Sequence, residues 1–245
     1  MDETMRLFWE TYSEFYSNEL MIHKNLNFLR DFEDDFIDGP ILELGSGQSS
    51  FLVEFSKTGR EIFAIDNDDF QLDKLKERIE SYAGKSAGKI HLLNITIPEK
   101  ELPDKKFSLV IASNFLHFFS INECEKIIKQ IISRTQKGSL VYVIVHSQLH
   151  SYNDPTDAGI KAYFKHFFSE NDLTNLFNEE YFERVLFLDM QQSKKSKYDK
   201  EMEIKWVEKI LDSNGIFDIQ KRQELIEQNT KDENVGSLVC IYRRK

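Results

Sequence analysis

The chain has 245 residues, a formal net charge of −10, and a composition in which 40% of residues are hydrophobic and 30% are charged. This length and composition predict one domain with a packed core, and the negative charge disfavours non-specific nucleic-acid binding, because few phosphates would be neutralised. The two cysteines, the lack of an apolar run of about 18 residues and the lack of an N-terminal signal pattern argue against a disulfide scaffold, a membrane helix and secretion, so we expect a cytoplasmic location.

The first predicted element is helical and covers residues 5–29. Apolar side chains recur along it at every fourth position, which places them on one face of the helix. These residues are Phe8, Tyr12, Tyr16 and Leu20. An acidic stretch followed by Gly39 and Pro40 then forms a turn that ends the N-terminal helical segment.

From residue 41 onward, short apolar runs alternate with amphipathic segments. The apolar runs predict strands at residues 41–44, 61–66, 89–94, 107–113 and 139–147. The amphipathic segments predict helices at residues 49–57, 70–82 and 122–135. Strands that are apolar throughout and separated by helices indicate an α/β fold, in which a parallel sheet is covered by helices on both faces.

After residue 147 the alternation becomes less regular. We predict helices at residues 156–168, 169–177 and 199–214, and strands at residues 181–190 and 236–244. Residues 192–232 separate the last two predicted strands and are interpreted as a helical insertion near the C-terminus.

The first predicted strand ends in a glycine turn, Gly45-Ser46-Gly47, and carries one carboxylate, Glu43. Ligands of open α/β sheets bind beyond the carboxyl ends of the strands, and glycines let the backbone turn tightly and approach a ligand closely. Polar residues stand at the carboxyl ends of the next strands as well: Asp66, Asn94, Ser113 and Asn114. This edge of the sheet is therefore the predicted binding site.

In residues Glu43 to Gly47, in Asp66 and in the spacing that follows, the chain resembles the class I S-adenosylmethionine-dependent methyltransferases. The resemblance covers residues 40–147 well and the last strands more loosely, and Ser49 stands where the family signature has a third glycine. It implies a Rossmann-like sheet of seven strands, mostly parallel, with an antiparallel last strand. It also implies one domain, residues 1–245, with an N-terminal helical lid (1–38), a cofactor-binding core (39–147) and an acceptor-side half (148–245).

A nicotinamide or flavin domain is the main alternative. Its fingerprint, Gly-x-Gly-x-x-Gly, requires a glycine where this chain has Ser50. Glu43 would repel a pyrophosphate, whereas its charge suits the ammonium and the sulfonium of S-adenosylmethionine. We therefore predict S-adenosylmethionine as the cofactor.

The resemblance also implies roles at the methionine end of the cofactor. Glu43 and the backbone of residues 45–47 would hold the methionine part. The backbone at Ser113 and Asn114 would accept hydrogen bonds from its ammonium group.

At the adenosyl end, the resemblance assigns Asp66 to the ribose hydroxyls. Asn67 would lie beside the adenine, and Asn94 would contact its amino group. The backbone N–H of Ile95 would meet a ring nitrogen.

Methyl transfer from a sulfonium is a direct displacement, so the protein mainly aligns the acceptor, and a base is needed only for an acceptor that carries a proton. The candidate bases follow the fourth and fifth predicted strands and are His117, His146 and His150. Lid or substrate-contact candidates in the N-terminal segment are Tyr12, Tyr16 and His23. We predict no metal site.

The residues after the fourth strand narrow the class of acceptor. Methyltransferases of base amines or glutamine amides carry Asn/Asp-Pro-Pro-aromatic there, whereas this chain has Ser113-Asn114-Phe115-Leu116. Cys124 lies too far along its helix to be the nucleophile that cytosine C5 chemistry requires. Aromatic residues of the C-terminal half favour an apolar or aromatic small molecule: Tyr163, Phe164, Phe167, Phe168 and Trp206.

Several alternatives remain open at this point. The acceptor is a small molecule in our main prediction, and a protein or peptide side chain or an RNA in the alternatives. A cofactor-binding partner protein without catalysis is a further possibility from another class. We expect a monomer or a homodimer that contacts neither nucleic acid nor membrane.

Overall fold

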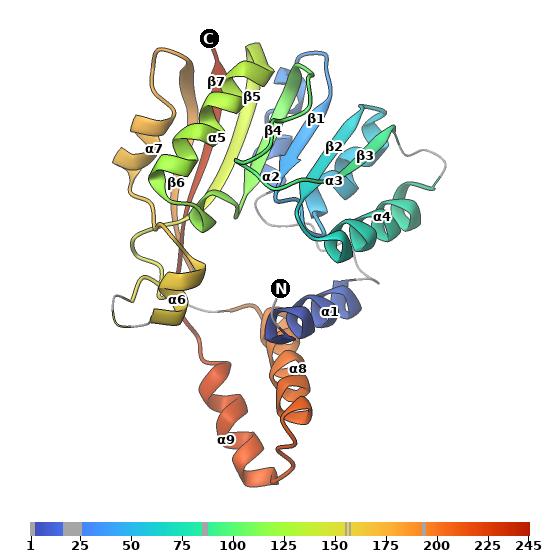
Figure 1. The fold of residues 1–245 in the computed structure, drawn as a ribbon, viewed down its shortest axis with the longest axis vertical. Coiled ribbons are helices and arrows are strands. Elements are labelled where there is room, and N and C mark those ends of the chain that lie inside the picture. The colour runs from blue at the N-terminus through green and yellow to red at the C-terminus, as the bar shows by residue number, and fades with distance from the viewer. Residues whose placement is uncertain (1–2, 17–25, 85–87, 155, 157, 193–194) are drawn as a thin grey trace. The chain divides into compact units, whose positions relative to one another are not determined.

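The structure is a computed structural model that describes residues 3–16, 26–84, 88–154, 156, 158–192 and 195–245 (Figure 1). The chain divides into two compact units. One unit, here called the helical unit, consists of Met1–Met21 and Gln192–Asn234. The other, the sheet unit, consists of Ile22–Gln191 and Val235–Lys245 and contains the glycine turn.

Seven strands form one sheet in the order β3-β2-β1-β4-β5-β7-β6 (Figure 1). The strands are β1 (Ile41–Leu44), β2 (Ile62–Asp66), β3 (Ile90–Asn94), β4 (Phe107–Ser113), β5 (Thr135–His146), β6 (Phe182–Gln192) and β7 (Val235–Arg244). Strands β1 to β5 pair in parallel, whereas β7 is antiparallel to β5. The predicted Rossmann-like sheet with an antiparallel last strand is confirmed. Its strand order reverses between β1 and β4, where ligands of such sheets bind.

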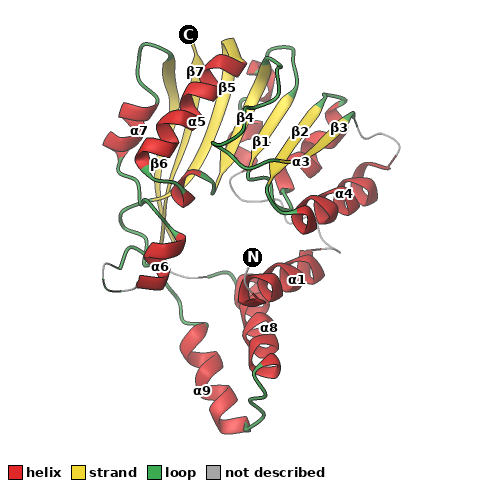
Figure 2. Cartoon of the chain, in the orientation of Figure 1, coloured by secondary structure: helices red, strands yellow, loops and turns green. Residues whose placement is uncertain are grey.

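Both faces of the sheet are buried, because alternate residues of each strand enter opposite cores. Leu42 and Leu44 of β1 pack in one core with α5 (Ile121–Arg134) and α7 (Glu170–Leu176). Ile41 packs in the other core with α3 (Ser50–Phe55) and α4 (Asp69–Ala83). This two-sided burial explains why the strands are apolar throughout, and Figure 2 shows the helices around the sheet.

The helical unit joins the N-terminal helix to the predicted insertion. It contains α1 (Glu3–Tyr16), α8 (Lys197–Ser213) and α9 (Ile219–Asn229). The Trp206 indole of α8 donates a hydrogen bond to the carbonyl of Thr4 at 3.0 Å, and its ring meets the Phe8 ring edge-on at a centroid distance of 5.2 Å. Segments that are far apart in the sequence therefore form one packed unit. α9 lies within the predicted helical insertion over residues 192–232, in which only the helix over 199–214 was predicted with bounds of its own.

Three predicted elements differ from the structure by more than two residues at one end. The helix predicted over 5–29 is seen as α1 and as α2 (Leu26–Arg30), and residues 17–25 lie outside the described part of the chain. The helix predicted over 156–168 extends only over α6 (Ala158–Tyr163). Beyond it, the Phe168 N–H donates to the His146 carbonyl at 2.9 Å, so the end of β5 satisfies this backbone in place of a helix. β5 itself begins at Thr135, four residues earlier than predicted.

None of the described helices has both the length and the apolar character that a membrane-spanning segment needs. The assignments of residues 1–38 as a lid and of 148–245 as the acceptor-side half stay predictions.

Candidate functional site at the carboxyl edge of the sheet

The glycine turn after β1 requires its two glycines for different reasons. Gly45 has a φ of +60° and Gly47 a φ of +48°, a region that side chains with a Cβ rarely occupy. A Cβ on Gly45 would lie 2.3 Å from Cδ2 of Phe115, so the ring that follows β4 excludes any side chain there. A Cβ on Gly47 would meet no atom within 4 Å, so there is open space beside this residue. The turn is thus tightly packed at Gly45 and accessible at Gly47.

Glu43 lies beneath this turn and is held by Ser49. Glu43 is only 3% exposed, and its Oε2 accepts a hydrogen bond from the Ser49 hydroxyl. The same hydroxyl accepts from the N–H of Leu52 at 3.0 Å and so caps the N-terminus of α3. Ser49, which departs from the family signature, therefore connects the carboxylate of β1 to the helix that follows the turn.

Burial sets the charge state of Glu43. Removal from water raises its pKa to about 8, and the nearby carboxylate of Asp66 acts in the same direction, against the Ser49 hydrogen bond. The carboxyl group therefore keeps its proton at neutral pH in the protein alone. A cation placed beside it would favour the ionised form and lower this pKa.

Asp66 ends β2 and links the glycine turn to α4. Its Oδ2 accepts from the N–H of Gly47 at 2.8 Å, and its Oδ1 accepts from the N–H of Asp68 at 3.1 Å. Partial burial raises the pKa of Asp66, against these backbone hydrogen bonds. Each carboxylate oxygen can accept a further hydrogen bond, so this side chain can also receive the hydroxyls of a ribose.

Two of the residues predicted near the adenine, Asn94 and Ile95, already take part in hydrogen bonds within the protein. The Asn94 amide donates to Oδ1 of Asp69 at 2.6 Å, and Asn67 is exposed. The N–H of Ile95 donates to the Asp66 carbonyl at 3.0 Å and extends the ladder between β2 and β3. A ring nitrogen would have to compete with this backbone bond, and the contact of Ile95 with the adenine stays a prediction.

The end of β4 contains an unusual backbone conformation. Asn114 has a φ of +52°, the single non-glycine residue of the described chain in this region, and its N–H donates to the Ile144 carbonyl at 2.9 Å. Asparagine tolerates this conformation better than most residues. It turns the chain after Ser113, so that Phe115 reaches Gly45 and the ends of β1 and β4 meet.

The three predicted histidines form one stack, here called the histidine cluster. The rings of His117 and His146 are 3.8 Å apart at 22°, and those of His146 and His150 are 4.1 Å apart at 29°. Phe164 meets the edge of His117 at 5.3 Å and lies tilted against His146 at 4.9 Å. The structure therefore brings together, at the carboxyl ends of β4 and β5, residues that are up to 33 positions apart in the sequence.

Hydrogen bonds distinguish the three imidazoles. Nδ1 of His117 accepts from the backbone N–H of His146 at 3.3 Å, and Nδ1 of His150 accepts from the N–H of Tyr152 at 3.1 Å. Nδ1 of His146 is buried and has no hydrogen-bond partner among the described residues. In their neutral forms, His117 and His150 must carry their proton on Nε2.

Burial keeps the cluster uncharged. It lowers the pKa of His146 to about 3 and that of His150 to about 4, and it lowers the pKa of His117 well below its usual value. Adjacent imidazoles add to the effect for His117 and His146, because two neighbouring cations would repel each other. At neutral pH the cluster is therefore an uncharged and largely buried aromatic stack, in which Nδ1 of His146 has no hydrogen-bond partner among the described residues.

The N-terminal candidates are placed only in part. Tyr12 lies in α1 of the helical unit, where its ring meets the Trp9 ring at 5.4 Å, and Tyr16 is the last residue of that helix. His23 lies outside the described residues. Within the described chain, no group of three or more His, Cys, Asp or Glu residues is arranged to hold a metal ion.

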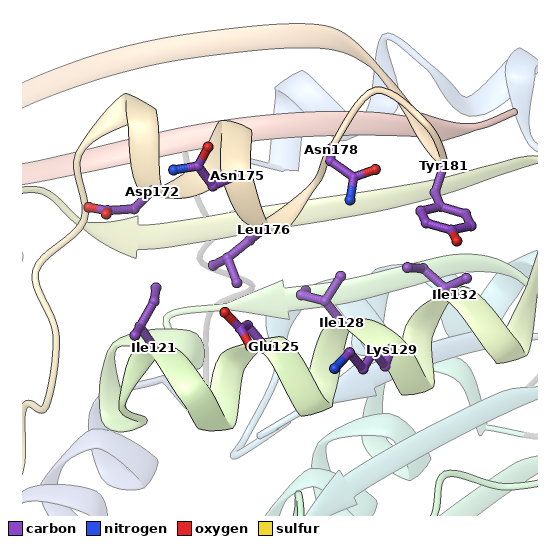
Figure 3. A pocket seen from close by; sticks show the side chains of 10 residues that line it. All are labelled: Ile121, Glu125, Ile128, Lys129, Ile132, Asp172, Asn175, Leu176, Asn178 and Tyr181. Carbon is purple, nitrogen blue, oxygen red and sulfur yellow. The ribbon is translucent and has the colours of Figure 1, made fainter.

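A groove of about 500 Å³ lies elsewhere in the sheet unit, between α5 and α7. Ile128 of α5 and Leu176 of α7 face each other across it, and Tyr181 lies at one end (Figure 3). None of the predicted site residues lines this groove. The groove therefore lies apart from the glycine turn and the histidine cluster.

Comparison with known proteins finds a family model that matches part of the chain and solved structures with a similar fold. Residues 41–138 match the family model of the methyltransferase domain, whereas no curated protein matches the sequence. The structure of an S-adenosylmethionine-dependent methyltransferase from Thiobacillus denitrificans, in complex with S-adenosyl-L-homocysteine, is similar with a TM-score of 0.66 at 14% identity, over 100% of this chain and 99% of that chain.

Two further solved structures have the same fold at low identity. TehB from Haemophilus influenzae has a TM-score of 0.64 at 14% identity, and the match covers 96% of this chain and 66% of that chain, slightly less than two thirds of TehB. Magnesium protoporphyrin IX methyltransferase (ChlM) from Synechocystis PCC 6803 has a TM-score of 0.57 at 8% identity, over 100% of this chain and 88% of that chain. The family match runs from β1 into β5 and so includes the whole glycine-turn edge, which means that this part of the chain matches a methyltransferase domain. The similar structures show that the chain has the fold of S-adenosylmethionine-dependent methyltransferases.

Proposed function

We propose that the protein transfers a methyl group from S-adenosylmethionine to a small apolar or aromatic molecule. The observation that carries this proposal is the histidine cluster with Phe164, an uncharged group of aromatic rings at the carboxyl ends of β4 and β5. It adjoins the strand ends where the family binds its cofactor. Flat aromatic walls favour a flat or apolar acceptor, because stacking and burial of apolar area both contribute to binding.

The residues of the glycine-turn edge fit the proposed cofactor. S-adenosylmethionine supplies, when bound, a methyl group on a positively charged sulfur. Glu43 is a buried carboxyl that a neighbouring cation would help to ionise, and the space beside Gly47 gives access to the turn. In this proposal Asp66 accepts the ribose hydroxyls, and the backbone at Ser113 and Asn114 accepts from the methionine ammonium.

The chain's own contribution to the reaction is alignment and the exclusion of water. In the proposal the cluster rings hold the acceptor against the methyl group, and Nδ1 of His146 accepts a hydrogen bond from a hydroxyl of the acceptor. A base with a low pKa is sufficient for such an acceptor, because a hydroxyl oxygen that has just gained a methyl group is an oxonium ion and releases its proton readily. His117 and His150 act as positioning residues that hold the His146 ring between them.

The charge of the chain supports a small molecule over RNA. A formal charge of −10 gives little counterion release on a phosphate backbone. One of the similar structures is that of a magnesium protoporphyrin IX methyltransferase, whose name indicates a small-molecule acceptor for that protein. This similarity is one of fold, and it supports only the class of acceptor.

The experiment is a transfer assay with S-adenosylmethionine labelled in its methyl group. The protein is incubated with a metabolite extract, with a protein extract and with total RNA, and label is counted after ultrafiltration and nuclease or protease digestion. We expect label in the small-molecule fraction, with a strong decrease in the His146→Phe variant. Label that appears only in protein or only in RNA would show that the acceptor is a protein or an RNA and not a small molecule. Tight cofactor binding without transfer to any fraction would indicate a binding protein in place of an enzyme.

A further inference from the structure

Gln71 is a buried amide without a hydrogen-bond partner. The residue is 3% exposed, and neither Oε1 nor Nε2 is paired within the described part of the chain. Buried amides are almost always hydrogen-bonded, because an unpaired one loses its contacts with water and gains none in return. An unpaired amide in this position therefore requires a physical reason.

The position of Gln71 relates it to the glycine turn. It lies in the first turn of α4, five residues after Asp66. Arg78 is seven residues further along the same helix, which is about two turns, so both residues lie on one face. The Arg78 guanidinium donates to the Gln48 carbonyl and, at 3.3 Å, to the Ser50 hydroxyl. This face of α4 is thus turned toward the segment that follows the glycine turn, and Gln71 lies at its end nearest the strand edge.

A second unpaired polar group lies in the glycine turn itself. The Ser46 hydroxyl is buried and has no partner among the described residues, while the Ser46 N–H donates to the Ile65 carbonyl at 2.8 Å. Ile65 precedes Asp66, whose carboxylate binds the N–H of Gly47. Two unpaired polar groups therefore lie near Asp66, one in the turn after β1 and one in the helix after β2.

We propose that the side-chain amide of Gln71 binds the adenine of the cofactor, with Oε1 accepting from the 6-amino group and Nε2 donating to a neighbouring ring nitrogen. A primary amide presents one acceptor and one donor side by side, which is how glutamine recognises adenine in nucleic acids. The inference rests on the proposed cofactor site and adds a base contact to it. The Asn94 amide nitrogen donates to Asp69, so only its carbonyl oxygen is left to accept from an amino group, and the Ile95 N–H already donates to the Asp66 carbonyl.

The test combines a protein variant with a ligand variant. Gln71→Met fills a similar volume without polar atoms, and an S-adenosylhomocysteine analogue with purine in place of adenine lacks the 6-amino group. Dissociation constants of both ligands are measured by calorimetry for both proteins. In the wild type we expect loss of the amino group to weaken binding about tenfold, the effect of one buried hydrogen bond. In Gln71→Met the two ligands should differ by less than about threefold, because the amino group has lost its acceptor.

Stability of the protein without ligand gives an independent readout. Gln71→Met should melt at the same temperature as the wild type or higher, because it removes an unpaired buried amide. Gln130→Met is the matched control, since the Gln130 side chain is paired: it accepts from the Leu102 N–H at 2.8 Å and donates to the Lys100 carbonyl at 3.3 Å. This control should melt at a lower temperature and keep the wild-type ratio between the two ligands.

The possible outcomes distinguish a failure of the role assigned to Gln71 from a failure of the proposed cofactor site. An equal loss on removal of the amino group in the wild type and in Gln71→Met overturns the role of Gln71 and leaves the cofactor site intact. A wild-type protein that binds neither ligand overturns both. Gln71→Leu provides the same comparison if the methionine variant fails to fold.

Discussion

His146 is the middle ring of the histidine cluster. Its replacement by phenylalanine removes the contribution of this ring to the pH dependence of the free energy of unfolding. Burial lowers its pKa to about 3, whereas a histidine of an unfolded chain titrates near about 6.5. Between these values the unfolded chain binds a proton that the folded protein does not. The contribution of His146 to the free energy of unfolding is therefore fully present above about pH 6.5 and is lost as the pH falls toward about 3.

The magnitude follows from the two pKa values. Between about pH 7 and about pH 5, a single histidine with these values lowers the free energy of unfolding by about 2 kcal/mol. His150, whose pKa is lowered to about 4, also lowers the free energy of unfolding as the pH falls over this range. Glu43 acts in the opposite direction, because its raised pKa of about 8 makes the folded protein bind the extra proton as the pH falls.

The assay is urea unfolding of the wild type and of His146→Phe at the two pH values. Glu43 and His150 are present in both proteins, so their contributions largely cancel in the difference. We expect the stability of the wild type relative to the variant to fall by about 2 kcal/mol between about pH 7 and about pH 5. Phe167→Leu changes packing against His146 and His150 without removing a titrating group, so its difference from the wild type should stay constant. A constant difference for His146→Phe as well would refute the buried, neutral state of this ring.

Three further predictions concern the glycine-turn edge. Gly45→Ala should destabilise the protein by at least about 1 kcal/mol more than Gly47→Ala in urea unfolding. Both substitutions place a Cβ on a residue with positive φ, but only the one at Gly45 meets the Phe115 ring. Equal effects would contradict that close contact. Ser49→Ala should cost about 1–3 kcal/mol, since α3 loses its cap and Glu43 its partner, and an unchanged urea midpoint would refute this coupling. Asp66→Asn should weaken binding of S-adenosylhomocysteine about tenfold or more in calorimetry, because charge-assisted hydrogen bonds are lost; an unchanged affinity would remove Asp66 from the site.

The sheet was predictable from the sequence because its chemistry is local. Strands such as Ile62–Asp66 and Phe107–Ser113 are buried on both faces, so nearly every residue in them is apolar and their boundaries are sharp. The carboxylate in β1, the glycine turn and the aspartate at the end of β2 indicated the binding edge, and the family resemblance that they carry implied the seven-stranded sheet. Predicted and observed strands agree within a few residues for this reason.

The helical predictions failed where the deciding contacts are tertiary. Phe164 and Phe167 continue the apolar pattern of α6, yet they pack on the histidine cluster in an extended segment whose backbone bonds to β5. α9 has no buried residue, and the sequence analysis predicted no bounds for it within the helical insertion. Hydropathy patterns report which residues are apolar, but they do not report which other segment covers them.

Within the site, the sequence indicated residue types but not their pairings. The bond between Ser49 and Glu43 crosses from a loop to a strand, and the stacking of His117 on His146 joins the ends of two strands. A serine at the start of a helix was a usable signal for the cap. The burial of Gln71 has no sequence signal, because a glutamine in the first turn of a helix is ordinarily exposed.

The central claim is that the edge formed by Glu43, the glycine turn and Asp66 binds an adenosyl sulfonium compound. Calorimetric titration of the purified chain, with S-adenosylmethionine in one series and NADH in another, tests it most directly. Saturable binding of one S-adenosylmethionine per chain, lost or strongly weakened in Asp66→Asn, together with no heat from NADH, is the predicted result. Saturable binding of NADH with no response to S-adenosylmethionine would contradict the assignment of this edge.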